Sequence, residues 1–82
     1  MKNEKKKQFE TSDFYLAAFC LANGLKLISI NRDNPHRALF VFEDTENREG
    51  WVEDFLFSRA RIEPKRFVSA IKELKQLLHF DL

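Results

Sequence analysis

The sequence predicts a compact α+β domain in which three helices pack on a small antiparallel sheet, in the order α-β-β-α-(β)-α. Three observations predict this fold. Residues 14–22 form an unbroken apolar run, two β-branched and aromatic runs flank the turn-rich residues 31–36, and apolar side chains recur at helical spacing after Pro64. The length suits one domain, which we expect at residues 9–82, after a basic disordered tail at residues 1–8.

The composition favours a small domain with an aromatic core. Nine Phe, one Trp and one Tyr each bring a large apolar area, and only two Gly and two Pro are present. A single Cys excludes an internal disulfide, which fits a reducing compartment. The apolar run is shorter than the roughly 20 residues that a membrane-spanning helix needs. We therefore expect a cytoplasmic protein with no membrane partner.

The first helix is expected to follow Thr11 or Ser12, either of which can cap it by accepting a hydrogen bond from a free backbone N–H. Asp13 then falls in the first turn, where a negative charge suits the helix dipole. Gly24 ends the helix, because glycine adopts the left-handed conformation at little cost. Apolar residues occupy every side of this helix, so we expect it to be buried all round.

Two strands are expected next, at Leu25–Ile30 and Arg37–Glu43, as an antiparallel hairpin joined by the turn-forming residues NRDNPH. The second strand is unusual because both of its faces are apolar, whereas a hairpin with one wet face alternates apolar with polar residues. One face carries Phe40 and Phe42, and the other carries Leu39 and Val41.

A second helix is expected from Asp44 or Thr45, as the cap, to Phe57, followed by a short third strand at Ala60–Ile62. The residues assigned to the inward face of this helix are Trp51, Val52, Phe55 and Leu56.

The third helix begins at Pro64, which favours the first position of a helix. Apolar residues then recur three and four positions apart, opposite a polar face. The inward-facing residues are Phe67, Ile71, Leu74 and Leu78, with Ala70 and Leu77 beside them.

Three stretches of the chain, SDFYLAAFCLANGLKLISI, RALFVFED and ARIEPKRFVSAIKELKQLL, resemble a small family of uncharacterised bacterial and phage domains, a domain of unknown function. The resemblance covers about Thr11 to Leu78. Its pattern is hydrophobic, so it implies a fold and a bacterial or phage origin but no chemistry. Members of the family place Asp before the proline that opens the last helix, whereas this chain has Glu63.

No pattern of catalytic or metal-binding residues is present in the sequence. His36, His79 and Cys20 are not spaced as ligand pairs, so we expect no metal and no cofactor. Glu63–Lys65 has the Glu-x-Lys spacing of some metal-dependent nucleases. The intervening proline is expected to open a helix, which turns the two side chains apart. We therefore expect that the protein is not an enzyme.

The two apolar faces of the hairpin predict self-association. Three short helices are few to cover both faces of a sheet, and a large apolar patch in water is uncommon on a monomer. We therefore expect a homodimer. The candidate interface residues are Leu39, Phe40, Val41 and Phe42. As an alternative, the first helix could cover one face while the other two cover the second.

Charge is segregated along the chain. Residues 43–54 hold six acidic side chains and one basic, residues 59–75 hold six basic and two acidic, and residues 1–8 carry a net charge of +3. These segments could be two solvated helix faces, or they could pair between chains in an association that salt weakens. Alternatively, basic residues near a helix N-terminus could bind phosphates. The candidate phosphate-binding residues are Arg59, Arg61, Lys65, Arg66 and Lys72.

These observations favour a non-catalytic binding module for protein–protein interaction with self-association. The alternative is a nucleic-acid-binding accessory domain that uses the basic segment at residues 59–75 and the lysine tail. No aromatic residue alternates with these basic side chains, which argues against a base-stacking surface.

Overall fold

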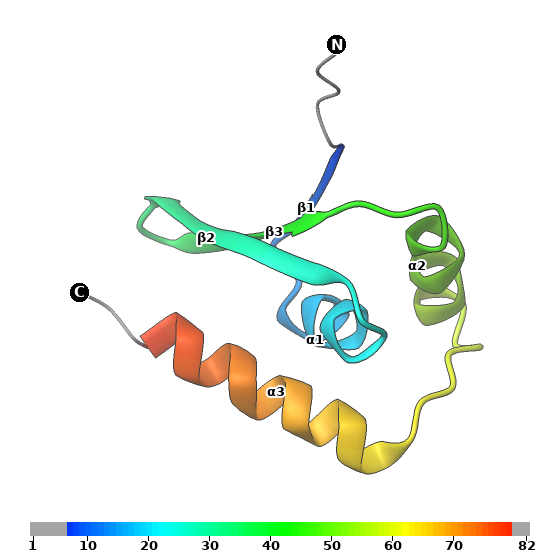
Figure 1. Ribbon diagram of the computed structural model, residues 1–82. Helices are drawn as coiled ribbons and strands as arrows, with labels where there is room; N and C mark the ends of the chain where they lie inside the picture. Colours follow the sequence, from blue (N-terminus) through cyan, green and yellow to red (C-terminus); the bar gives the residue numbers. More distant parts are fainter. Residues whose placement is uncertain (1–6, 80–82) are drawn as a thin grey trace, which may run out of the picture.

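The computed structural model describes residues 7–79, which form a three-stranded antiparallel sheet and three helices in the order β1-α1-β2-β3-α2-α3 (Figure 1). The predicted α+β class with three helices is confirmed. The elements are β1 (Gln8–Thr11), α1 (Phe14–Ala22), β2 (Lys26–Asn34), β3 (Arg37–Glu43), α2 (Arg48–Leu56) and α3 (Pro64–His79).

The third strand of the sheet comes from the N-terminal side of the chain, not from Ala60–Ile62. β3 lies in the centre, with β2 on one side and β1 on the other, both antiparallel. A central strand has only two edges, so no place beside β3 remains for residues 60–62, which lie between α2 and α3. Gln8, predicted as part of the tail, is the first residue of β1. Residues 1–6 of the predicted tail lie outside the described residues.

The strand register decides which face of the sheet meets the helices. Phe9, Phe42 and Leu27 lie in one row across the sheet, and this face contacts the buried cluster around α1. On the opposite face, Val41 lies between Glu10 and Ser29.

Ile28 is an extra residue in β2. The register shifts between Leu27 and Ser29, and this bulge leaves the Ile28 side chain 46% exposed.

Helix α1 is the centre of the core, as its apolar sequence predicts. It lies beneath the sheet, with α3 and α2 packed against it (Figure 1). Leu16–Cys20 are all buried, and the ring of Phe14 meets that of Phe40 edge-on at 6.0 Å. Five consecutive buried residues point to every side of the helix, which explains why α1 has no polar face, although Tyr15 in its first turn is 55% exposed.

The cap of α1 differs from the predicted one. Asp13 is the N-cap, and its carboxylate accepts hydrogen bonds from the backbone N–H groups of Tyr15 (3.0 Å) and Leu16 (3.1 Å). Thr11 instead accepts a hydrogen bond from the N–H of Asp13. The end of the helix is as expected, because Gly24 follows it with a φ of 98°, in the left-handed region that favours glycine.

Helix α3 begins at Pro64, as predicted, and Glu63 caps it. Ala70 and Leu74 are buried against α1. At the other end, the Arg32 guanidinium donates hydrogen bonds to the carbonyls of Leu77 (3.2 Å) and Leu78 (2.6 Å). This contact joins β2 to free carbonyl groups in the last turn of α3.

Helix α2 is the least buried of the three helices. It starts at Arg48 rather than at Asp44 or Thr45, and its N-cap residue, Asn47, makes no side-chain capping bond. No residue of α2 is fully buried, and it packs on α1 through contacts such as the Phe19–Phe55 pair, whose ring centroids are 5.5 Å apart. A short helix of this kind depends on its packing contacts for stability.

Candidate functional site

Two of the four predicted interface residues, Phe40 and Phe42, are buried inside their own chain. Phe40 and Phe42 are 2% and 0% exposed, because they contact α1 of their own chain. Val41 on the opposite face is 6% exposed, between polar neighbours on both flanking strands, and Leu39 is half-buried. Phe40 and Phe42 are therefore unavailable to a second copy. Leu39 and Val41 offer it little apolar surface.

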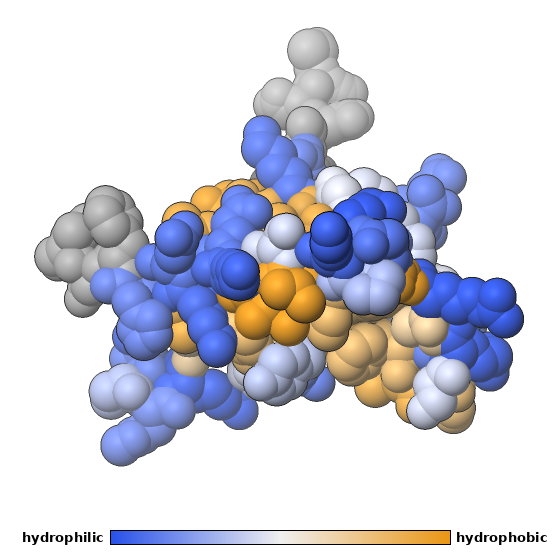
Figure 2. Space-filling view, turned by 90° about the horizontal axis from the view of Figure 1, so that it is seen from below, coloured by the Kyte–Doolittle hydropathy of each residue, from blue (hydrophilic) through white to orange (hydrophobic). Residues whose placement is uncertain are grey.

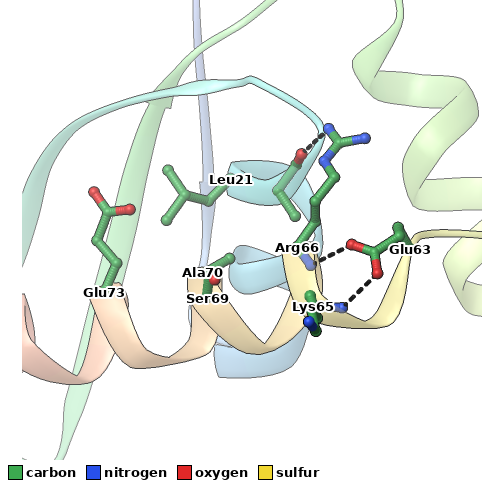
Figure 3. A pocket seen from close by; sticks show the side chains of 8 residues that line it. Leu21, Glu63, Lys65, Arg66, Ser69, Ala70 and Glu73 are labelled. Atoms are coloured by element: carbon green, nitrogen blue, oxygen red, sulfur yellow. Dashed lines mark hydrogen bonds between the residues drawn. The ribbon is translucent and has the colours of Figure 1, made fainter.

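The expected phosphate site at the start of α3 is already occupied by a carboxylate of the same chain. Glu63 accepts hydrogen bonds from the backbone N–H groups of Lys65 (3.2 Å) and Arg66 (3.0 Å), as Figure 3 shows. The Arg66 guanidinium donates to the carbonyl of Ala22 at the end of α1. The surrounding cavity, of about 300 Å³, is lined by Glu73 and Glu63 as well as by Lys65 and Arg66. The two carboxylates offset the two cations, so the lining offers an anion no net positive charge.

The other predicted phosphate-binding residues do not join this cavity. Arg59 and Arg61 line a separate depression with Asp54, and the Nε of Arg59 lies 3.6 Å from the carboxylate of Asp54. Lys72 lies two turns along α3 from Lys65 and is exposed. The structure therefore does not bring the five residues into one anion site.

An ion pair joins the end of β3 to the first turn of α2. Arg48 donates from Nε (2.9 Å) and Nη2 (3.0 Å) to the two carboxylate oxygens of Asp44, and its guanidinium lies 4.5 Å from the centroid of the Phe9 ring. The hydrogen bond from Arg48 lowers the pKa of Asp44, and the same bond raises the pKa of Arg48. Asp44, predicted as a cap, instead holds α2 to the sheet.

The described residues offer no evident reactive group. Burial raises the pKa of the Cys20 thiol to about 11, against the opposing charge of Arg48, so the thiol stays protonated at neutral pH. Within residues 7–79, no three His, Cys, Asp or Glu side chains lie close enough to hold a metal ion. No helix in this part of the chain is long and apolar enough to cross a membrane.

The most exposed apolar surface lies at the end of α2. Leu56 and Phe57 are each 63% exposed, whereas the sequence predicts Leu56 on the inward face of the helix. Glu53 and Glu49 lie three and seven residues before Leu56, on the same side of the helix, and both are exposed. We call these four residues the acidic patch of α2. Figure 2 shows hydrophobic side chains at the surface on the right, the end that holds α2 in Figure 1.

A second patch of opposite charge lies on the outer side of α3. Its apolar residue is Val68, which is 47% exposed. Lys65 lies three residues before it, and Lys72 and Lys75 lie four and seven residues after it, all exposed and on one side of the helix. We call these four residues the basic patch of α3.

Among residues 7–79, the charged groups of the two patches make no ion pair within 4.0 Å, in contrast to Asp44, Arg48, Asp54 and Arg59. The pKa of the Arg48 guanidinium is raised first by its hydrogen bond to Asp44, and the charge of the neighbouring Glu49 also helps to raise it. Each patch therefore combines exposed apolar surface with charges of one sign that form no close ion pair. Beside the acidic patch, the guanidinium of Arg59 lies 5.5 Å from the Phe57 ring centroid and is itself paired with Asp54. The sequence contained a signal for both, namely Leu56 at helical spacing from two glutamates and Val68 at helical spacing from three lysines. Leu56 is predicted on the inward face because it directly follows Phe55, which does pack against the core.

The comparisons with known proteins identify a family. A family model described as a domain of unknown function (DUF5659) matches residues 6–80, a wider range than the predicted resemblance. No curated protein and no solved structure matches the chain significantly. The chain belongs to the family of this domain of unknown function.

Proposed function

We propose that the protein is a non-catalytic protein-interaction module that associates with itself. The observation that carries the proposal is the exposure of Leu56 and Phe57, two adjacent large apolar side chains, each 63% exposed. The side chains that pack α2 on α1 leave these two outside the core. Exposed aromatic and aliphatic groups next to charged ones are typical of protein interfaces.

The rest of the described structure supports binding rather than catalysis. The only thiol is buried and protonated, and the carboxylates at the start of α3 and at Asp44 are engaged in hydrogen bonds that organise the fold. These groups stabilise helix ends and element junctions. At the exposed end of α2, by contrast, the Arg59 guanidinium lies 5.5 Å from the centroid of the Phe57 ring, and this contact leaves Phe57 63% exposed.

Sedimentation equilibrium over about a hundredfold concentration range tests the proposal. The natural protein should show a concentration-dependent dimer, and Leu56→Ser with Phe57→Ser should weaken the dimer at least about tenfold, because interface anchors of this kind contribute about 1–2 kcal/mol or more each. The matched control is Tyr15→Ser with Ile28→Ser, which removes two exposed apolar side chains elsewhere and should leave the dimer unchanged. A natural protein that remains monomeric throughout would refute self-association.

A second candidate function is nucleic-acid binding, which the lysines of the basic patch of α3 favour. Three unpaired lysines along one exposed side of a helix can contact successive phosphates without base readout. Fluorescence anisotropy with DNA and RNA at about 50 mM salt tests this function. Binding that falls steeply with salt and is lost on Lys65→Ala with Lys72→Ala would support it. No binding, or binding lost only when residues 1–8 are removed, would refute it.

A further inference from the structure

We propose that two copies of this chain meet patch to patch. The acidic patch of α2 in each copy docks on the basic patch of α3 in the other, around a twofold axis. This inference rests on the self-association proposed above and adds which surfaces meet and why. Its occupant is a second copy rather than an unrelated partner, because each chain carries both members of a complementary pair.

The two patches match in pattern as well as in charge. Each has its apolar side chain on the same side of the helix as the charged ones, at spacings of three, four or seven residues. Leu56 and Val68 can therefore face each other while the flanking glutamates and lysines pair around them. An apolar centre with a polar rim is the usual anatomy of a protein interface.

The patches cannot easily satisfy each other within one chain. Helices α2 and α3 both pack on α1, and both patches point away from it, since their charged residues are exposed. In the link between the helices, residues 57–63, Arg59 forms an ion pair with Asp54. Glu63, at the end of this link, caps α3. A second chain is then the simplest source of opposite charge for each patch.

The charges favour contact between unlike patches, and a twofold axis is the arrangement in which two copies use all of them. Pairing α2 with α2, or α3 with α3, would bring like charges together, which is unfavourable. In a twofold dimer, α2 of each copy contacts α3 of the other, so the same contact forms twice and no patch stays free. If two copies shared only one such contact, each would keep a free patch, and further copies could add to form a filament. The formal net charge of +1 leaves little overall repulsion between two chains, so the local patches decide the orientation.

Helix α2 also stands to gain stability from such a contact. Glu49 and Glu53 lie four residues apart, a spacing at which like charges slightly destabilise a helix. The helix has no side-chain N-cap bond and no fully buried residue. Lysines from a second copy would remove the repulsion between the glutamates and cover Leu56.

Charge reversal tests the inference. Glu49→Lys with Glu53→Lys makes both patches positive, and Lys65→Glu with Lys72→Glu makes both negative. Each variant alone should dimerise at least about tenfold more weakly than the natural protein, since like charges then face each other. Mixed one to one, the two variants should form a heterodimer with affinity restored to within about threefold, because both contacts are attractive again. Native mass spectrometry distinguishes the heterodimer, and circular dichroism checks that each variant is folded.

The controls are charge reversals on the sheet and its turn, Glu10→Lys with Asp33→Lys and Lys26→Glu with Arg37→Glu, which involve exposed residues outside both patches. They should leave dimerisation unchanged. If they abolish it instead, the contact lies on the sheet and the inference is refuted. It is also refuted by species larger than a dimer, or by variants that fail to restore each other.

The outcomes separate this inference from the proposed function. A dimer that is lost with Leu56→Ser and Phe57→Ser but is insensitive to the reversals keeps the proposed function and overturns the charge-paired geometry. A natural protein that is monomeric at every concentration overturns both.

Discussion

Replacing Arg48 with alanine is expected to lower the free energy of unfolding by about 2 kcal/mol. The variant removes two hydrogen bonds from the guanidinium to Asp44, at 2.9 and 3.0 Å, and its contact with the Phe9 ring at 4.5 Å. These contacts connect α2 with both β3 and β1. Because α2 has no fully buried residue, their loss falls on the helix with the least other support.

The magnitude follows from the geometry of the ion pair. Hydrogen bonds to charged groups contribute about 1.5–3 kcal/mol, and a cation over an aromatic ring adds about 0.5–1 kcal/mol at a partly exposed site. The side chains of Arg48 and Asp44 are 25% and 15% exposed, so water screens part of the interaction and the sum falls near 2 kcal/mol. For a domain of this size, that corresponds to a fall in Tm of about 8–16 °C.

The effect should depend on pH in a defined direction. The hydrogen bond from Arg48 lowers the pKa of Asp44, so the folded state holds this carboxylate ionised more readily than the unfolded state does. A carboxyl with a lowered pKa stabilises the fold above its unfolded pKa of about 4, and this contribution disappears as the pH falls through the folded value. The cost of Arg48→Ala should therefore be full at neutral pH and shrink below about pH 4.

Urea denaturation followed by the fluorescence of Trp51, which lies in α2, measures the effect at neutral and acidic pH. The matched control is Arg59→Ala. Its pair with Asp54 is longer, at 3.6 Å, and the two side chains are 59% and 50% exposed, so the expected cost is below about 0.5 kcal/mol. If Arg48→Ala costs no more than Arg59→Ala, or costs as much in acid as at neutral pH, the reasoning is refuted.

Three further variants or measurements test other parts of the structure. Glu63→Ala should cost about 1 kcal/mol in urea denaturation, because it frees two backbone N–H groups of α3, whereas Glu63→Asp should be neutral or stabilising, since Asp is the better N-cap. Cys20 should resist a thiol reagent at neutral pH in the folded state and react fully in urea; rapid labelling of the folded protein would contradict its burial and its raised pKa. Phe42→Ala should cost about 3–5 kcal/mol, and a cost near zero would contradict its place in the core.

The helices were predictable to within a few residues because their signals are local. The residues that signal a helix lie in the helix itself or next to it. Examples are the apolar run of α1, Gly24 just after its end and Pro64 at the start of α3. The cap of α1 was wrong by one or two residues, because Thr11, Ser12 and Asp13 are all competent caps. The prediction of Asp44 as the cap of α2 was wrong because the helix begins at Arg48, and the guanidinium of Arg48 binds both carboxylate oxygens of Asp44.

The candidate site was less predictable, because exposure depends on contacts between distant segments. The two-sided apolar character of β3 predicts that both of its faces need cover, and the structure shows α1 on the face of Phe40 and Phe42. Nothing local, however, showed that α1 covers Phe40 and Phe42 or that Val41 lies between the polar residues Glu10 and Ser29. The spacing of the apolar residues in α2 also did not show that Leu56 lies outside the core.

By itself, the amino-acid sequence determined the fold class, the hairpin, the buried first helix, the amphipathic last helix and the segregation of charge. These properties follow from periodicity, turn residues and composition, which act over a few neighbouring residues. Only the tertiary structure decided that Gln8–Thr11 supplies the third strand, that one face of β3 is closed by α1, and that the exposed apolar side chains lie next to charges of one sign. Strand partners and exposed faces are set by contacts between segments far apart in the chain, and the spacing of residues within a segment does not record which distant segment it meets.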